Sequence, residues 1–288
     1  MIDWPEQLIN DFASQRVVVF IGSGVSRNSV GEDGKTRPKG WFDFLQDAAL
    51  KKNLMGLVKP YLDRGDYLTT LDLIRNKLTR DQYSALVTNE YLAPKYAEAP
   101  IHHHIYRIGS NIVLSPNFDK IYDIYAAHKS RGTVVIKHYY DEGLARFIRG
   151  DQRVVIKIHG TVDDPERMIF GRRDYAESRT RYGWFYDMLR ALVITHTFVF
   201  IGCGTDDPDI RLLFEDVNFS AGQAREHYFV AAQDSIDSSM KIILRDTMNL
   251  SVLEYSFDKN IKSHQDLTDS LENLAHIVES SRPVPPVV

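Results

Sequence analysis

Four segments of this chain place glycine, serine, asparagine, histidine or aspartate directly after an apolar run. Residues 22–26 (GSGVS), 115–119 (SPNFD), 159–160 (HG) and 202–207 (GCGTDD) each follow such a run. Runs of this length that are rich in β-branched residues are typical of buried strands. Because the ligand crevice of a parallel sheet lies beyond the carboxyl ends of its strands, these segments are the candidate functional site.

The first segment has the composition of a phosphate-binding turn. Gly22 and Gly24 allow a tight turn and a close approach of the backbone to a ligand. Ser23 and Ser26 are suited to cap a following helix, whose amino end attracts phosphate. Such a turn also serves close backbone packing, so it leaves binding and packing open. A dehydrogenase-type site needs a third glycine and, about 20 residues further on, an acidic residue at the end of a second strand. Neither is present, so such a site is disfavoured.

Asn117 and His159 are the candidate catalytic residues. The Asn117 amide combines a donor with an acceptor, which suits it to hold a ribose hydroxyl and an attacking water. The imidazole of His159 is suited to exchange protons near neutral pH, with a buried structural histidine as the alternative. For Asp119 a turn or helix-cap role is favoured over direct binding.

The spacing of the remaining histidines and the single cysteine do not fit a catalytic metal site. Residues 102–104 (HHH) lie in a predicted helix start after Pro100, where consecutive side chains point to different sides. Cys203 is the only cysteine, so the chain alone builds neither a disulfide nor a Cys-rich zinc module. We therefore expect a reducing compartment and no metal.

The elements that position these residues follow an α/β pattern. Most of the apolar runs are nearly continuous, which predicts strands covered by helices on both faces of an α/β, doubly wound, mainly parallel, Rossmann-like sheet. Between about residues 41 and 97 the pattern is that of amphipathic helices, including 41–51 and 67–78, and predicts a helical insertion or lid. The predicted strands are 16–21, 111–114, 133–137, 153–158, 197–201, 227–232 and 251–255.

Length and charge limit the classes of protein. The 288 residues, 43% of them hydrophobic, suit one large domain, expected over residues 1–280, with a flexible proline-rich tail at 281–288. A net charge of −4 without a long basic block disfavours direct nucleic-acid binding. The chain shows no apolar leader and no stretch long enough to cross a bilayer, so we expect no membrane association and a cytoplasmic location.

At the four strand ends the sequence resembles the SIR2 (sirtuin) family, and specifically the SIR2-like domains of prokaryotic antiphage defence. Residues 22–26 resemble the first glycine motif, 115–119 the asparagine element, 157–160 (KIHG) the histidine element, and 200–204 with 207–210 the late glycine motif. Residues 168–170, 174–175 and the closing pattern over 227–279 fit as well, so the resemblance covers nearly the whole chain. It implies a sirtuin/DHS-like NAD site formed by Gly22, Ser23, Gly24, Ser26, Asp119, Gly202, Gly204 and Asp207, with Asn117 and His159 as catalytic residues.

Two departures from the family set the expected activity. The paired zinc cysteines of the deacetylase sirtuins are missing, and residues 28–40 lack the usual G-x-P-D-F-R. The resemblance therefore implies an NAD+ hydrolase that releases nicotinamide and ADP-ribose. A deacylase, an ADP-ribosyltransferase and a non-catalytic NAD or ADP-ribose sensor are the alternatives. The resemblance implies an NAD-depleting effector of abortive infection. Because constant NAD cleavage would kill the host, the activity must be held off until it is triggered, so we expect a regulatory protein partner, a homo-oligomer or both.

Overall fold

Within the described residues, seven parallel strands form a single sheet in the order β3-β4-β2-β1-β5-β6-β7. The computed structural model describes residues 1–149, 152–204, 207–221, 225–258, 260 and 263–282. The expected tail lies outside the described residues from 283 onward. The strands are β1 (Val17–Ile21), β2 (Ile112–Ser115), β3 (Val135–His138), β4 (Val154–Lys157), β5 (Thr197–Ile201), β6 (His227–Ala232) and β7 (Leu250–Tyr255). All seven predicted strands and their parallel arrangement are confirmed.

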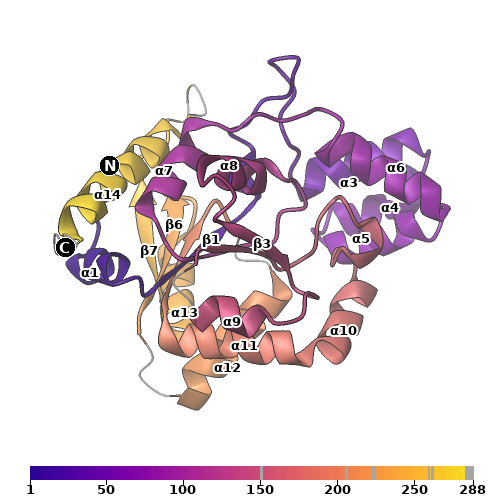
Figure 1. Ribbon diagram of the computed structural model, residues 1–288. Coiled ribbons are helices and arrows are strands. Elements are labelled where there is room, and N and C mark those ends of the chain that lie inside the picture. Colours follow the sequence, from indigo (N-terminus) through magenta and orange to yellow (C-terminus); the bar gives the residue numbers. More distant parts are fainter. Residues whose placement is uncertain (150–151, 205–206, 222–224, 259, 261–262, 283–288) are drawn as a thin grey trace.

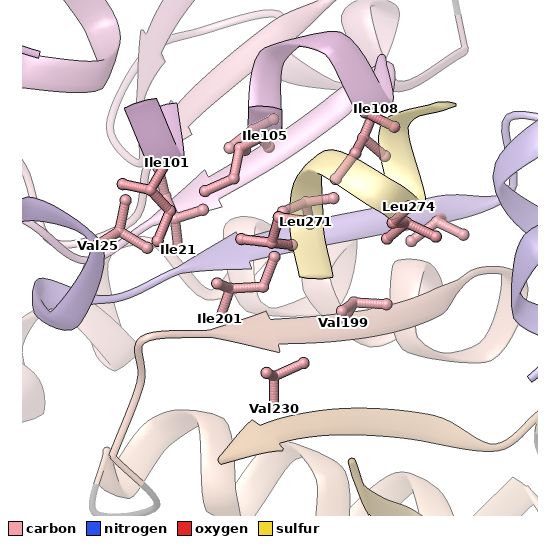
Figure 2. Packing of buried hydrophobic residues seen from close by; sticks show 14 of the residues in the cluster. Ile21, Val25, Ile101, Ile105, Ile108, Val199, Ile201, Val230, Leu271 and Leu274 are labelled. Carbon is pink, nitrogen blue, oxygen red and sulfur yellow. The ribbon is translucent and has the colours of Figure 1, made fainter. Parts of the chain in front are cut away.

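Helices cover both faces of the sheet, because alternate strand residues point to opposite sides. One face packs against α1 (Glu6–Ala13), α7 (Pro100–Ile108), α8 (Ile121–Lys129) and α14 (Gln265–Ser281). Figure 2 shows part of this core, where Ile21 and Val199 of the strands lie near Ile105 and Leu271 of the helices. The other face packs against α9 (Leu144–Arg149), α10 (Arg172–Arg181), α11 (Gly183–Thr195), α12 (Pro208–Ala221) and α13 (Ser238–Met248) (Figure 1).

The segment predicted as a helical insertion consists of four helices. They are α3 (Trp41–Lys51), α4 (Met55–Leu62), α5 (Tyr67–Arg75) and α6 (Arg80–Tyr91), and Figure 1 shows them grouped beside the sheet, near α10. Their apolar side chains form a core of their own with Phe118, Met168 and Phe170. Two short turns complete the described helices, α2 (Ser23–Ser26) and the 3-10 turn η1 (Pro165–Arg167).

The winding of the chain determines where a crevice opens. β2, β4 and β3 lie on one side of β1, whereas β5, β6 and β7 lie on the other. The direction of winding thus reverses between β1 and β5, which pair from Val17–Thr197 to Ile21–Ile201. Gly22 and Gly202 follow these two strands directly, so both glycine loops stand where open α/β sheets bind ligands. In the described part of the chain, every helix is too short or too polar to cross a membrane.

Candidate active site

The two glycine loops pack directly on each other. The Gly24 N–H donates to the Gly202 carbonyl at 2.8 Å, and the Gly22 N–H donates to the Ile201 carbonyl at 2.9 Å. A Cβ atom on Gly22 would lie 2.5 Å from the Gly202 oxygen, and one on Gly24 would lie 2.9 Å from the Gly202 Cα atom. These distances are too short for real contacts, so packing between loops requires both glycines. Of the two roles that the sequence left open for these glycines, ligand binding and backbone packing, the contact supports packing.

The serines of the first loop do not cap its helix. Gly22 occupies the N-cap position of α2 without any side-chain hydrogen bond, so the capping role expected for Ser23 and Ser26 is wrong. Ser23 is the exposed first residue of α2. Ser26 is buried, and its hydroxyl donates to Oδ2 of Asp119 at 2.7 Å. Ser26 therefore supports the loop that follows β2.

Asn117 is held in one orientation by the first loop. Its Nδ2 atom donates to the Gly22 carbonyl and to Oγ of Ser26, both at 3.0 Å. Both N–H bonds of the amide are thus used within the protein, whereas Oδ1 has no hydrogen bond in the described structure. The amide can therefore only accept a hydrogen bond from a ligand. The sequence-based expectation that it offers a donor as well is wrong.

Asp119 supports the turn after β2 through hydrogen bonds within the protein, as its position after a strand and a proline favoured. Its Oδ1 atom accepts the Ile121 N–H at 3.0 Å, and Oδ2 accepts the Ser26 hydroxyl. Its carbonyl accepts Nζ of the buried Lys157 at 2.5 Å, and that ammonium also pairs with Asp123 at 2.9 Å. Burial raises the pKa of Asp123, and the Lys157 charge opposes this shift. No sequence pattern pointed to Asp123, because only the fold brings α8 beside β4.

His159 is oriented by a carboxylate. The residue is 5% exposed, and its Nε2 atom lies 3.2 Å from Oδ2 of Asp207. Oδ1 of Asp207 accepts the N–H groups of Asp209 and Ile210 at 3.1 and 3.0 Å at the start of α12. The carboxylate is therefore fixed by a helix end at a short distance from the imidazole. A histidine held in this way is suited to act as a general base.

Tyr175 is a site residue whose role the sequence did not indicate. Its hydroxyl donates to Oδ2 of Asp207 at 3.2 Å, and its ring meets the His159 ring edge-on with centroids 5.3 Å apart. Residues 174–175 matched the family pattern only by their order along the chain. The contact arises because the fold brings Tyr175 of α10 beside His159, which follows the end of β4, and local spacing does not reveal this.

A cavity of about 870 Å³ joins these groups. This volume is typical of sites that bind small molecules. The opposite wall comes from the helical segment and includes the aromatic residues Trp41, Tyr67 and Tyr91. Eight of the ten predicted site residues line the cavity, whereas Gly24 and Gly202 serve the packing of the loops. The eight are Gly22, Ser23, Ser26, Asn117, Asp119, His159, Gly204 and Asp207.

Four cations also line the cavity. Lys39 pairs with Asp47 and Glu90, and Arg172 pairs with Asp66. Arg27 and Arg64 make no ion pair with any residue that the structure describes, so their charges remain available to an anionic ligand. Cys203 lies at the same edge, but burial raises the pKa of its thiol, which makes it a poor nucleophile.

The histidine run shows no sign of a metal centre. His102 is buried and its Nδ1 atom accepts the Ala99 N–H at 3.0 Å, whereas the His103 ring stacks on Tyr125. Among the described residues, no group of three or more His, Cys, Asp or Glu side chains is placed to hold a metal ion. The absence of a catalytic metal stays a prediction. Residues 205 and 206 of the late glycine motif lie outside the described residues.

Comparison with known proteins agrees with these motifs. Residues 111–253 match the family model of the SIR2-like domain. The chain is 20% identical over 230 residues to the NAD(+) hydrolase ThsA of Acinetobacter baumannii (strain 532279), covering 78% of this chain and 44% of that protein. It is 20% identical over 258 residues to defense-associated sirtuin 2 of Bacillus subtilis, covering 88% of this chain and 24% of that protein.

A third relative is the NAD(+) hydrolase ThsA of Enterococcus faecium, which is 24% identical over 146 residues, or 42% of this chain and 30% of that protein. The chain spans less than half the length of the curated relatives that it matches. The matched segment contains β2, β4 and β5 with Asn117, His159 and Asp207. The chain therefore has an α/β, Rossmann-like fold, matches the SIR2-like domain over residues 111–253, and is similar to proteins named NAD(+) hydrolase ThsA and defense-associated sirtuin 2.

Proposed function

We propose that this chain hydrolyses the nicotinamide–ribose bond of NAD+ and releases nicotinamide and ADP-ribose. The observation that carries the proposal is the convergence of the Asn117 acceptor and the His159–Asp207 pair in one cavity at the sheet crevice. The printed names of two relatives, NAD(+) hydrolase, support the same reaction. We propose residues 1–280 as the catalytic domain.

The proposed reaction uses water as its nucleophile. The C1′–N bond to nicotinamide breaks with its electron pair on the leaving ring, and the ribosyl carbon becomes oxocarbenium-like. Oδ1 of Asn117 accepts a hydrogen bond from a ribose hydroxyl or from the attacking water. Because Nε2 of His159 faces Oδ2 of Asp207, Nδ1 is the ring nitrogen that takes the proton when water forms the new C1′–O bond. Arg27 and Arg64 supply positive charge for the pyrophosphate.

The carboxylate behind His159 favours catalysis over a sensor role. A protein that only bound NAD or ADP-ribose would need no group to hold a buried imidazole in one orientation. Deacylation and ADP-ribosyl transfer would use the same pair with another acceptor, so the products decide between these reactions. The role as an NAD-depleting effector of antiphage defence is part of the proposal, supported by the relative named defense-associated sirtuin 2.

The test is to incubate the purified chain with NAD+ and to quantify nicotinamide, ADP-ribose and any acylated product by chromatography. The proposal expects nicotinamide and ADP-ribose in equal amounts, without a requirement for an acetylated peptide and without an effect of EDTA. Nicotinamide release that depends on acetyl-peptide would instead identify a deacylase. Loss of activity with EDTA that added metal restores would contradict the metal-free reaction.

We also propose that assembly or a protein partner controls this activity, because the helical segment forms one wall of the cavity. The segment is tied to α10 by the Arg75–Asp174 ion pair at 2.8 Å, and α10 carries Tyr175. Movement of the segment would thus shift Tyr175, which contacts both Asp207 and His159. NAD+ turnover measured against oligomeric state by light scattering tests this. Rapid turnover by a monomer, unchanged by co-expressed neighbouring gene products, would refute it.

A further inference from the structure

A second cavity lies at the opposite end of the sheet from the candidate active site. Its volume is about 560 Å³, and its lining includes Tyr106, Arg107, Arg153, Glu279 and Arg282. Arg153 directly precedes β4, so the cavity opens at the amino ends of the strands, whereas Asn117 and His159 follow the carboxyl ends. A ligand here would not touch the proposed NAD site.

The charges that line this cavity are unbalanced. Among the described lining residues, three guanidinium groups face one carboxylate, and Arg107 already binds Glu279, with Nη2 and Oε2 2.9 Å apart. Arg153 and Arg282 form no ion pair with any residue in the described ranges. Arg282 donates from Nη2 to the carbonyls of Ile108 and Gly109 at 2.7 and 3.0 Å. This contact caps the end of α7, but a helix end offers only about half an elementary charge against two cations.

The two unpaired arginines converge on one point above Gly109. A Cβ atom built there would lie 2.7 Å from Nη2 of Arg153 and 2.7 Å from Nη1 of Arg282. Gly109 has φ +73°, so the chain uses a glycine where both guanidinium groups approach the backbone. Nε of Arg282 is buried and has no hydrogen-bond partner among the described residues. Burial and the charge of Arg153 lower the pKa of Arg282.

Two adjacent guanidinium groups that form no ion pair with a described carboxylate are suited to a phosphate, whose oxygens accept parallel N–H bonds from planar forks. We propose that this cavity binds a phosphate or pyrophosphate group of a small ligand between Arg153 and Arg282. The cavity is larger than one phosphate, and its remaining space borders the Tyr106 ring, over which the Arg153 guanidinium lies at 5.2 Å. The proposal does not depend on NAD hydrolysis.

The test is equilibrium dialysis of the full chain with radiolabelled inorganic pyrophosphate at constant ionic strength. Arg153→Gln and Arg282→Gln should each weaken this binding about tenfold or more, because each removes a charge-assisted hydrogen bond. Arg153→Lys should retain part of the affinity. Arg245→Gln, which changes an exposed arginine of α13, should retain the binding and serves as the control. Any pyrophosphate binding that Arg27→Gln and Arg64→Gln remove belongs to the proposed NAD site and is subtracted.

Two results would overturn the proposal. One is equal pyrophosphate affinity and stoichiometry in the wild type and in both glutamine variants. The other is no binding by the wild type at millimolar pyrophosphate. Because Arg282→Gln also removes the cap of α7, thermal unfolding of each variant is measured first. Arg153→Gln keeps both Arg282 bonds and removes only a longer bond, 3.4 Å from Arg153 Nη1 to the Tyr106 carbonyl, so it tests the site even if the Arg282 variant fails to fold.

Discussion

Oδ2 of Asp207 lies 3.2 Å from Nε2 of His159, while Oδ1 of the same carboxylate accepts the first N–H groups of α12. One side chain therefore fixes both the start of a helix and the orientation of the proposed base. The two functions are separable, because an amide oxygen can cap a helix but does not carry the negative charge that stabilises an imidazolium.

Asp207→Asn should accordingly lower kcat for NAD+ about 100-fold while the protein stays folded. Tyr175→Phe, which removes a second donor to the carboxylate, should have a smaller effect of the same sign. The matched control is Asp237→Asn, because Asp237 caps α13 by accepting the Met240 N–H at 2.9 Å, in a loop outside the cavity lining. Steady-state kinetics decide the matter, and a normal kcat in folded Asp207→Asn would refute the role of the carboxylate.

Ser26→Ala should impair the orientation of Asn117. The change removes the acceptor for one Asn117 N–H and the donor to Asp119, so kcat should fall about tenfold and the free energy of unfolding by about 1–3 kcal/mol. Ser270→Ala is the control, since Ser270 is equally buried and its Oγ accepts the Ile2 N–H at 2.9 Å. Urea unfolding should show a loss in both variants. Kinetics should show a loss only in Ser26→Ala, and equal kcat in the two would contradict the prediction.

Gly24→Ala should destabilise the protein through the contact between loops. The new Cβ atom would lie 2.9 Å from Gly202, so one of the two loops must shift to make room for it. Gly56→Ala in α4 is the control, because its Cβ meets no atom within 4 Å and alanine favours a helix. Thermal unfolding should show a lower Tm for Gly24→Ala and an unchanged or higher Tm for Gly56→Ala. A stable Gly24→Ala with weakened NAD+ affinity would instead place the ligand against Gly24.

Stability should fall in acid through His227. Burial lowers the pKa of this residue from 6.5 to about 4, and its Nδ1 atom accepts the Phe198 N–H at 3.0 Å. Because the folded-state pKa is the lower one, the neutral form stabilises the fold above pH 6.5, and this contribution is lost as the pH falls towards 4. The loss should reach up to about 3 kcal/mol.

His227→Asn keeps an acceptor for the Phe198 N–H but does not titrate. Urea unfolding between pH 7 and 4 should therefore show a shallower pH dependence in this variant than in the wild type. Identical pH dependence in the two proteins would show that His227 does not titrate as its burial requires.

Sequence patterns predicted the strands well because each is a short apolar run covered on both faces. Motif order also predicted the cluster of Asn117, His159 and Asp207, since the carboxyl ends of parallel strands share one edge. Contacts between distant segments were not predictable. Which atom of Asn117 faces the cavity depends on Ser26 and Gly22, and the partner of Lys157 comes from α8. The use of Gly24 for packing became clear only from its distance to Gly202.

The measurement that tests the account most directly compares NAD+ cleavage and NAD+ binding in the wild type, Asn117→Ala and His159→Ala over a range of protein concentrations. Nicotinamide release is followed by chromatography and binding by calorimetry. We expect both variants to remain folded and to bind NAD+, and to lose activity by about 100-fold or more, because removal of a general base has effects of this size. Release at the wild-type rate by folded His159→Ala, or a wild type that neither binds nor cleaves NAD+ at any concentration, would contradict the account.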